Sequence, residues 1–258
     1  MLLAIDIGNS NVVFGLFDKD KLIDMWRVHT VVNKTSDEYE AIFRTFLASR
    51  NIKIDSISRV VISSVVPSLN FAMRNMIGNL FGVDPLVIAP KIYNKLPIEI
   101  RNPYQIGSDL VANATMVSEC YDGGSIVVDM GTALTCLAVD GRGKILGVTI
   151  CPGLKTAMSA LSQKTAQLPH VNIEAPPSVL GTNTVHAIQA GVVLGYKGLI
   201  ASLVNDMKKE IGDDNLNVIA TGGLSVVMYP LLKDVFTERE PDLTLKGIRI
   251  IGELVLGK

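Results

Sequence analysis

A carboxylate, a glycine and several small polar residues occur together at two places in the chain, each time directly after an apolar run. The first stretch reads AIDIGNSN and the second reads VVDMGTALT. The residues there that could take part in chemistry are Asp6, Gly8, Asn9, Ser10, Asn11, Asp129, Gly131, Thr132 and Ala133. Tight turns of glycine and small polar residues present consecutive backbone N–H groups, and such turns bind phosphate oxygens. We therefore expect both stretches to hold the phosphates of a polyphosphate ligand.

The two carboxylates need a different role, because an anion does not bind phosphate. Carboxylate oxygens are the ligands that Mg²⁺ and related hard cations prefer. Cations held at Asp6 and Asp129, directly or through water, would neutralise the charge of the phosphates. We therefore expect Asp6 and Asp129 to be metal-binding residues.

A third glycine motif lies near the end of the chain. The stretch NVIATGGLS at 217–225 predicts an apolar strand, a turn at Gly222 and Gly223, and a helix that begins near Ser225. Paired glycines between a strand and a helix allow a flat ligand, such as a base or a ribose, to approach the backbone closely. Taken alone, the motif is equally typical of a simple tight turn. Together with the two Asp-x-Gly turns, it favours a nucleotide site.

The elements that must position these turns occur in the same order twice. The chain begins with three predicted strands, LLAIDIG, NVVFGLFD and KLIDMWRVHT, and Thr35 then opens a helix. Residues 125–150 again predict a strand that ends in Asp-x-Gly, a second strand, a glycine-containing turn and a third strand. For a single copy, coincidence is the alternative, since Asp-x-Gly is a common turn. Two copies in the same hairpin context indicate an internal duplication.

The duplication predicts an α/β protein with two similar domains that face each other across a cleft. The helix expected from Leu110 to Cys120 is followed by Tyr121-Asp122-Gly123-Gly124, a sequence that ends helices. We therefore expect an N-terminal domain at 1–120 and a C-terminal domain at 121–258.

Composition and charge exclude several classes of protein. Of the 258 residues, 48% are hydrophobic and 19% are charged, and the formal net charge is −1. This charge gives no electrostatic attraction for nucleic acid. No apolar run approaches the roughly 18 uncharged residues of a membrane-spanning helix, and the start MLLAIDIG lacks the basic residues of a signal peptide. We expect a cytoplasmic protein that binds neither nucleic acid nor membranes.

The cysteines and histidines do not have the spacing of a disulfide framework or of a zinc site. We expect all six to be structural. They are Cys120, Cys136, Cys151, His29, His170 and His186.

Taken together, the motifs resemble those of the acetate and sugar kinase, Hsp70 and actin superfamily, and within it those of the type III pantothenate kinases. The two Asp-x-Gly stretches are similar to the family's phosphate loops, and ATGGLS is similar to its adenosine turn. Further similar segments are LGVTICPGL at 146–154, TAQLPHV at 165–171 and GTNTVHAIQAGVVLG at 181–195. The resemblance implies two duplicated ribonuclease H-like (actin-like ATPase) domains that face each other across a nucleotide cleft. It also implies ATP-dependent phosphorylation of pantothenate to 4'-phosphopantothenate, the first step of coenzyme A biosynthesis.

The family's Gly-x-Asp-Arg motif corresponds here to Gly107-Ser108-Asp109-Leu110. The resemblance implies that Asp109 is the general base that takes the proton of the pantothenate hydroxyl. It also implies a set of residues that contact the substrate, with the threonine at the family's Gly-x-x-Thr position. These residues are Tyr104, Gly107, Ser108, Asp109 and Thr184.

In the family, the Arg of this motif binds the substrate carboxylate, and Leu110 replaces it here. A charge-assisted hydrogen bond contributes about 1.5–3 kcal/mol, so its loss predicts roughly tenfold to hundredfold weaker binding of pantothenate. Loss of a general base typically costs a factor of about 10²–10⁴ in rate. We therefore expect the replacement of Arg by Leu110 to weaken the binding of pantothenate more than it slows the phosphoryl transfer. We hypothesise that Arg101, in the same loop, partly compensates.

The resemblance further implies ATP, Mg²⁺ and a monovalent cation, K⁺ or NH₄⁺, as cofactors. It also implies a homodimer in which the partner subunit closes the substrate pocket. Leu110 keeps one alternative open, a nucleotide-binding homologue that is catalytically impaired or altered in specificity and acts as a regulator. Another kinase of the superfamily, such as a sugar kinase, is disfavoured by the short chain and by the match at 165–195.

Overall fold

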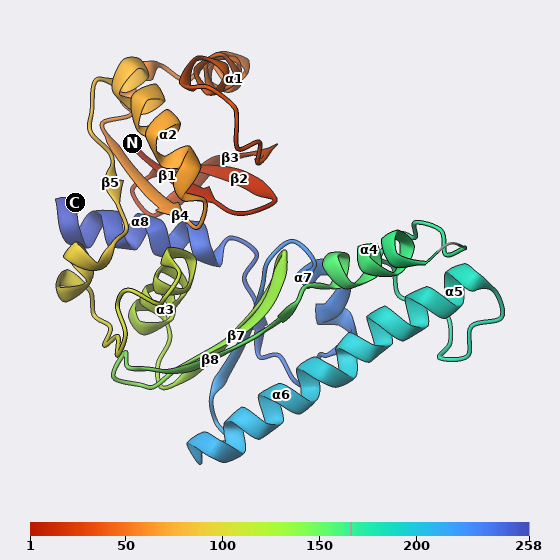
Figure 1. The fold of residues 1–258 in the computed structure, drawn as a ribbon. Helices are drawn as coiled ribbons and strands as arrows, with labels where there is room; N and C mark the ends of the chain where they lie inside the picture. Colours follow the sequence, from red (N-terminus) through yellow and green to blue (C-terminus); the bar gives the residue numbers. More distant parts are fainter. Residues whose placement is uncertain (166, 258) are drawn as a thin grey trace. The chain divides into compact units, whose positions relative to one another are not determined.

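The computed structural model describes residues 1–165 and 167–257, and it contains two five-stranded sheets that carry helices (Figure 1). The chain divides into two compact units. The first contains Met1–Glu119 and the segment that begins at Leu243, and the second contains Cys120–Asp242. Two residues, Ala166 in the segment TAQLPHV and Lys258, lie outside the described part of the chain.

The sheet of the first unit has the strand order β3-β2-β1-β4-β5. Its central strand β1 is apolar and almost wholly buried, as a strand covered on both faces must be. Asp6, the fifth residue of β1, pairs with Val13 of the antiparallel strand β2 and with Ser63 of the parallel strand β4. A carboxylate therefore lies near the carboxyl end of the central strand. The strands are β1 (Leu2–Ile7), β2 (Asn11–Asp18), β3 (Lys21–His29), β4 (Arg59–Ser64) and β5 (Leu86–Val87).

Helices pack on both faces of this sheet. On one face, Phe43 of α1 lies against Phe14 and Trp26, with ring centroids 5.0 and 5.7 Å apart. On the other face, Val111 of α3 and Ile248 of α8 are buried against the sheet. The helices of this unit are α1 (Ser36–Ser49), η1 (Ile54–Ser56), α2 (Pro67–Phe81), η2 (Pro90–Lys95), α3 (Ser108–Cys120) and α8 (Leu243–Leu256).

The last helix, α8, corrects the domain boundaries expected from the sequence. A Cβ atom at Gly247 would collide with the backbone of Ala112 in α3, and one at Gly252 would lie 2.7 and 2.8 Å from side-chain atoms of Val61 and Leu2. These close approaches place α8 directly on the first sheet. The second unit therefore does not extend to the end of the chain, because α8 supplies the apolar cover that one face of the first sheet requires.

The sheet of the second unit has the order β10-β9-β6-β7-β8, which repeats the topology of the first sheet. Asp129, the fifth residue of β6, pairs with Thr135 of the antiparallel strand β7 and with Thr221 of the parallel strand β9. The internal duplication predicted from the sequence is thus confirmed, since Asp6 and Asp129 occupy the same place in the two sheets. The strands are β6 (Ser125–Met130), β7 (Ala133–Val139), β8 (Ile145–Pro152), β9 (Asn217–Thr221) and β10 (Glu238–Arg239).

One continuous helix, Thr184–Ile211, is long and apolar enough to cross a membrane by length and composition, within the described residues. The expectation that no run approaches such a length was therefore wrong. The structure accounts for the apolar character, because Val193, Ile200 and Val204 are buried in the core of the second unit. The helices of this unit are α4 (Leu154–Lys164), α5 (Thr184–Gln189), η3 (Ala190–Leu194), α6 (Gly195–Ile211), α7 (Ser225–Met228) and η4 (Tyr229–Leu231).

Candidate active site

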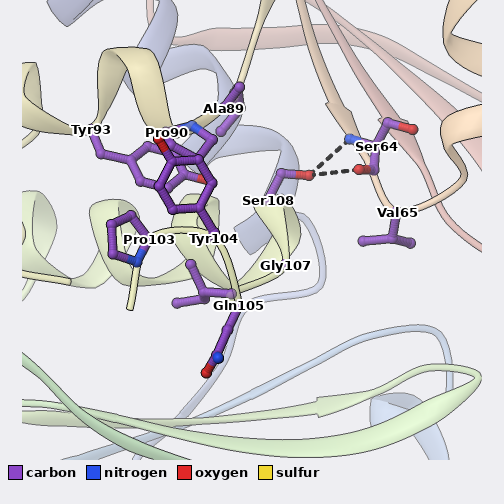
Figure 2. Close-up of a pocket in the computed structure, with 12 residues that line it drawn as sticks. Ser64, Val65, Ala89, Pro90, Tyr93, Pro103, Tyr104, Gln105, Gly107 and Ser108 are labelled. Atoms are coloured by element: carbon purple, nitrogen blue, oxygen red, sulfur yellow. Dashed lines mark hydrogen bonds between the residues drawn. The ribbon is translucent and has the colours of Figure 1, made fainter. Parts of the chain in front are cut away.

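A pocket of about 400 Å³ lies in the first unit, between the end of β4, the segment around η2 and the start of α3 (Figure 2). Figure 2 shows the rings of Tyr93, Pro103 and Tyr104 on one side of it and the side chains of Ser64 and Val65 on the other. Three of the predicted substrate residues, Tyr104, Gly107 and Ser108, belong to its wall. The lining residues are Ser64, Val65, Ile88, Ala89, Pro90, Tyr93, Pro103, Tyr104, Gln105, Ile106, Gly107 and Ser108.

Ser108 fixes the first turn of α3 to the end of β4. Its hydroxyl accepts a hydrogen bond from the backbone N–H of Ser64 at 2.8 Å and lies 3.1 Å from the carbonyl oxygen of the same residue, to which it donates. The hydroxyl of Ser63 is 2.9 Å away. Since β4 is the parallel neighbour of β1, these bonds hold α3 beside the strand that carries Asp6.

Asp109, the predicted base, is the second residue of α3 and follows Ser108 directly. The backbone N–H of Leu110 donates to Asp109 Oδ1 at 2.9 Å, and a Cβ atom at Gly107 would collide with the same oxygen. Glycine is therefore required at 107 for this placement of the carboxylate. Burial raises the pKa of the Asp109 carboxyl, and the backbone N–H groups of Leu110 and of Asp109 itself act in the opposite direction.

The position of Leu110 differs from that of a substrate contact. Its side chain is only 8% exposed, and it is not among the described residues that line the pocket. Arg101 is exposed and is likewise absent from the lining, so the structure gives no support to its hypothesised compensating role. Tyr104, in contrast, lines the pocket while 89% of its surface remains exposed.

The first Asp-x-Gly turn is held in shape by β3 and by its own backbone. The N–H of Gly8 donates to the carbonyl of Asn11 at 3.0 Å, which closes the turn. Thr30, just after β3, donates from its hydroxyl to the carbonyl of Gly8 at 2.6 Å and from its N–H to the carbonyl of Ser10 at 3.0 Å. Asn9 and Ser10 are exposed at the tip. The sequence patterns did not single out Thr30.

The second turn is built in the same way and is supported by α4. The N–H of Gly131 donates to the carbonyl of Ala133 at 3.0 Å, and the carbonyl of Thr132 accepts from the N–H of Gly153 at 3.0 Å and from the hydroxyl of Thr156 at 2.7 Å. A Cβ atom at Gly153 would lie 2.6 Å from the carbonyl oxygen of Thr132. In the sequence, Gly153 was noted only as part of the segment LGVTICPGL, and this close approach to the second loop was not predicted.

The third glycine motif meets the second turn within the second unit. Gly222 has a φ of +83°, and a Cβ atom there would collide with Asp129 Oδ1 and lie 2.7 Å from the N atom of Met130. Only glycine fits this position. Gly223 is exposed in the turn, and α7 begins at Ser225 as predicted. Asp129, the residues 131–133 and Gly222 are therefore gathered at the carboxyl end of β6 and β9.

The remaining predicted substrate residue is Thr184. It is the exposed first residue of α5, in the second unit, and Asn183 caps that helix. In the described part of the chain, no three His, Cys, Asp or Glu side chains gather as a metal site. A cation at Asp6 or Asp129 would therefore need most of its ligands from water or from phosphate oxygens, which is how proteins commonly hold Mg²⁺.

Comparison with known sequences gives one consistent result. A family model described as type III pantothenate kinase matches residues 2–206. Relatives with that name are 42% identical over 97% of both chains in Myxococcus xanthus (strain DK1622) and in Geotalea uraniireducens (strain Rf4). These relatives give no support to the alternative of a regulator without kinase activity.

Comparison with solved structures supports the fold. The chain is similar to the activator of 2-hydroxyisocaproyl-CoA dehydratase from Clostridium difficile with bound ADPNP, with a TM-score of 0.52, 11% identity, and 98% of this chain and 95% of that chain covered. It is also similar to the inorganic polyphosphate/ATP-glucomannokinase from Arthrobacter sp. strain KM, with a TM-score of 0.51, 17% identity, and 100% and 99% covered. At these identities the likeness shows the fold alone, and it confirms the predicted α/β class with duplicated ribonuclease H-like domains.

Proposed function

Because the chain belongs to the type III pantothenate kinase family, it phosphorylates pantothenate in coenzyme A biosynthesis, and we propose that it does so with Asp109 as the general base. The observation that carries this assignment is the position of Asp109 at the start of α3, directly after two residues of the pocket wall. A base must reach the hydroxyl whose proton it takes, and the place of Asp109 next to two lining residues supports this role, although Asp109 itself is not among the described residues that line the pocket.

The environment of Asp109 suits a base. Its buried carboxyl has a raised pKa, so the carboxylate holds a proton more strongly than an exposed Asp would. The backbone N–H groups of Leu110 and of Asp109 itself favour the charged form and so act against the effect of burial on this pKa. Gly107 and Ser108 are positioning residues in this proposal, because the first leaves room for the carboxylate and the second ties α3 to β4.

ATP supplies the phosphoryl group, and we propose that the two Asp-x-Gly turns and the Gly222 turn hold it. The turn at Gly222 supports this proposal because it packs directly on Asp129 and Met130, so that the glycine turn and the second Asp-x-Gly turn lie together at the carboxyl end of β6. The residues concerned are Asp6, Gly8, Asn9, Ser10 and Asn11 in one unit, and Gly131, Thr132, Ala133, Gly222 and Gly223 in the other. The solved relative of the same fold with bound ADPNP supports this proposal.

We propose that Asp6 and Asp129 hold the cations of the reaction, Mg²⁺ and a monovalent K⁺ or NH₄⁺. Each lies at the same place of its sheet, at the carboxyl end of a central strand. Cations there would neutralise phosphate charge. We further propose a cytoplasmic homodimer in which Thr184 contacts the substrate, supported by its exposure at the start of α5.

A product assay tests the proposed function. Purified protein is incubated with ATP, Mg²⁺ and K⁺, with and without pantothenate, and the products are separated and identified by mass. We expect ADP and 4'-phosphopantothenate in equal amounts, formed only when pantothenate is present. ATP hydrolysis that does not depend on pantothenate would contradict the proposal.

A further inference from the structure

Thr30 directly follows β3 and spans the first Asp-x-Gly turn. Its backbone N–H donates to the carbonyl of Ser10 at 3.0 Å, and its hydroxyl donates to the carbonyl of Gly8 at 2.6 Å. The pairing of β2 with β3 ends at Asn11 and His29, so Thr30 continues the third strand one residue beyond that ladder. A single residue next to the turn thus holds two of its carbonyls.

The bond to Gly8 fixes the direction of a whole peptide unit. The carbonyl of Gly8 and the N–H of Asn9 belong to one planar trans peptide, so the two groups point in opposite directions. Because the carbonyl points at the hydroxyl of Thr30, the N–H of Asn9 points away from Thr30. Glycine and asparagine are the residues that best tolerate the reversed orientation of such a unit. The residue types of the turn therefore leave both orientations open, and the hydroxyl of Thr30 selects one of them.

The direction of this N–H decides what the turn can bind. Turns of this kind bind phosphate oxygens through backbone N–H groups that point at the ligand. Asn9 and Ser10 are exposed at the tip, so a ligand can reach the turn there. A turn that already holds its N–H groups in the binding orientation does not have to be ordered when the ligand arrives, which favours affinity.

The second unit carries a brace of the same kind. The carbonyl of Thr132 in the second turn accepts hydrogen bonds from the N–H of Gly153, the first residue after β8, and from the hydroxyl of Thr156 in the first turn of α4. In each sheet, the segment after the third strand therefore supplies one backbone N–H and one threonine hydroxyl to the turn between the first two strands. The occurrence of this brace in both copies of the duplication connects it with the turns themselves.

We propose that Thr30 is a positioning residue for ATP, whose hydroxyl holds the peptide unit between Gly8 and Asn9 so that the N–H of Asn9 faces a phosphate oxygen. This inference rests on the proposed function, because it concerns one of the turns proposed to hold ATP. Thr30 acts through the turn and makes no contact of its own with the nucleotide.

Three substitutions of Thr30 test the inference. Thr30→Val keeps the branched shape and the backbone N–H but removes the hydroxyl, and Thr30→Ala is a second variant without the hydroxyl. We expect both to weaken ATP binding about tenfold by calorimetry and to raise the KM for ATP by a similar factor. The KM for pantothenate should not change. Thr30→Ser keeps the hydroxyl, so it should bind ATP nearly as the wild type does.

Thr45→Val is the matched control in the same unit. The hydroxyl of Thr45 donates to the carbonyl of Ala41 within α1 at 2.9 Å, far along the chain from the turn. Loss of this bond should leave ATP binding unchanged. The inference is overturned if Thr30→Val binds ATP as tightly as Thr45→Val does, or if Thr30→Ser loses as much affinity as Thr30→Val. In both cases the proposed function stands as long as the wild type forms 4'-phosphopantothenate, and a wild type that forms none would overturn the proposed function instead.

Discussion

The hydroxyl oxygens of Ser63 and Ser108 lie 2.9 Å apart in the interior of the first unit, where neither side chain is more than 6% exposed. The contact joins β4 to the first residue of α3. Ser108 also bonds both backbone groups of Ser64. Because Asp109 is the next residue, these bonds determine where the proposed base lies.

Removing this hydroxyl should reduce both stability and turnover. Ser108→Ala leaves the partly buried N–H of Ser64 without its partner, and we expect this to lower the free energy of unfolding by about 1 kcal/mol. Trp26 is the single tryptophan of the chain and is buried in the same unit, so its fluorescence reports unfolding there. We also expect a lower kcat with little change in the KM for ATP, because α3 loses its tie to β4.

A second serine of α3 provides the matched control for this variant. The hydroxyl oxygen of Ser118 is buried and has no hydrogen-bond partner among the described residues. Ser118→Ala should therefore cost almost nothing in stability and leave kcat at the wild-type value. Equal losses in the two variants would mean that the bonds of Ser108 have no special part in holding the helix.

Asp109→Asn should abolish most of the turnover while nucleotide binding persists. The amide keeps the size of the side chain and can still accept the N–H of Leu110, but it cannot take a proton. We expect kcat to fall by a factor of about 10²–10⁴, with an unchanged dissociation constant for ATP measured by calorimetry. Turnover near that of the wild type would assign Asp109 to capping of α3 instead.

The same substitution should stabilise the protein at neutral pH. Burial raises the pKa of Asp109 in the folded state, so stability is lost as the pH rises from the unfolded pKa of about 3.9 through the folded pKa. Above this window the wild type carries a desolvated charge that Asn lacks. Urea unfolding followed by Trp26 fluorescence should show Asp109→Asn to be more stable at pH 7, with a difference that shrinks towards pH 4. A difference independent of pH would contradict the desolvation of the carboxyl.

The local patterns of the sequence predicted the strands, the turns and the topology well, because each depends on neighbouring residues. The capping box of Thr35 and Glu38 is present as expected, and the two Asp-x-Gly hairpins occupy equivalent places in the two sheets. Hydrophobic periodicity and the residue types of turns depend on residues that are close in the chain, so they can be recognised in a single sequence.

Contacts between distant segments could not be predicted in the same way. The packing of α8 on Val61 joins residues nearly two hundred positions apart. No pattern near Gly252 in the sequence predicts this contact. Leu110 stands where the resemblance implies an Arg that binds the substrate, and the motif alone does not show that the side chain at this position is buried. Periodicity shows which face of a helix is apolar, but the identity of the segment that covers this face depends on the tertiary fold.

The close approach of Gly222 to Asp129 makes Gly222→Ala a direct test of the nucleotide site in the second unit. The new methyl group would collide with Asp129 Oδ1 and lie 2.7 Å from the N atom of Met130, and the φ of +83° adds backbone strain. The turn must shift to relieve this collision, which displaces the carboxylate and the second loop together. We expect an affinity for ATP at least tenfold lower by calorimetry, and a lower midpoint of thermal unfolding.

Gly212→Ala is the control that separates the effect of backbone strain at a positive φ from the effect of the collision with Asp129. Gly212 also has a positive φ, of +75°, at the end of α6, but a Cβ atom there meets nothing within 4 Å. This control should lose about 1–2 kcal/mol of stability through backbone strain alone and bind ATP as the wild type does. If Gly222→Ala behaves like Gly212→Ala in both measurements, the turn at 222 does not take part in nucleotide binding, and the proposal for ATP then rests on the two Asp-x-Gly turns alone.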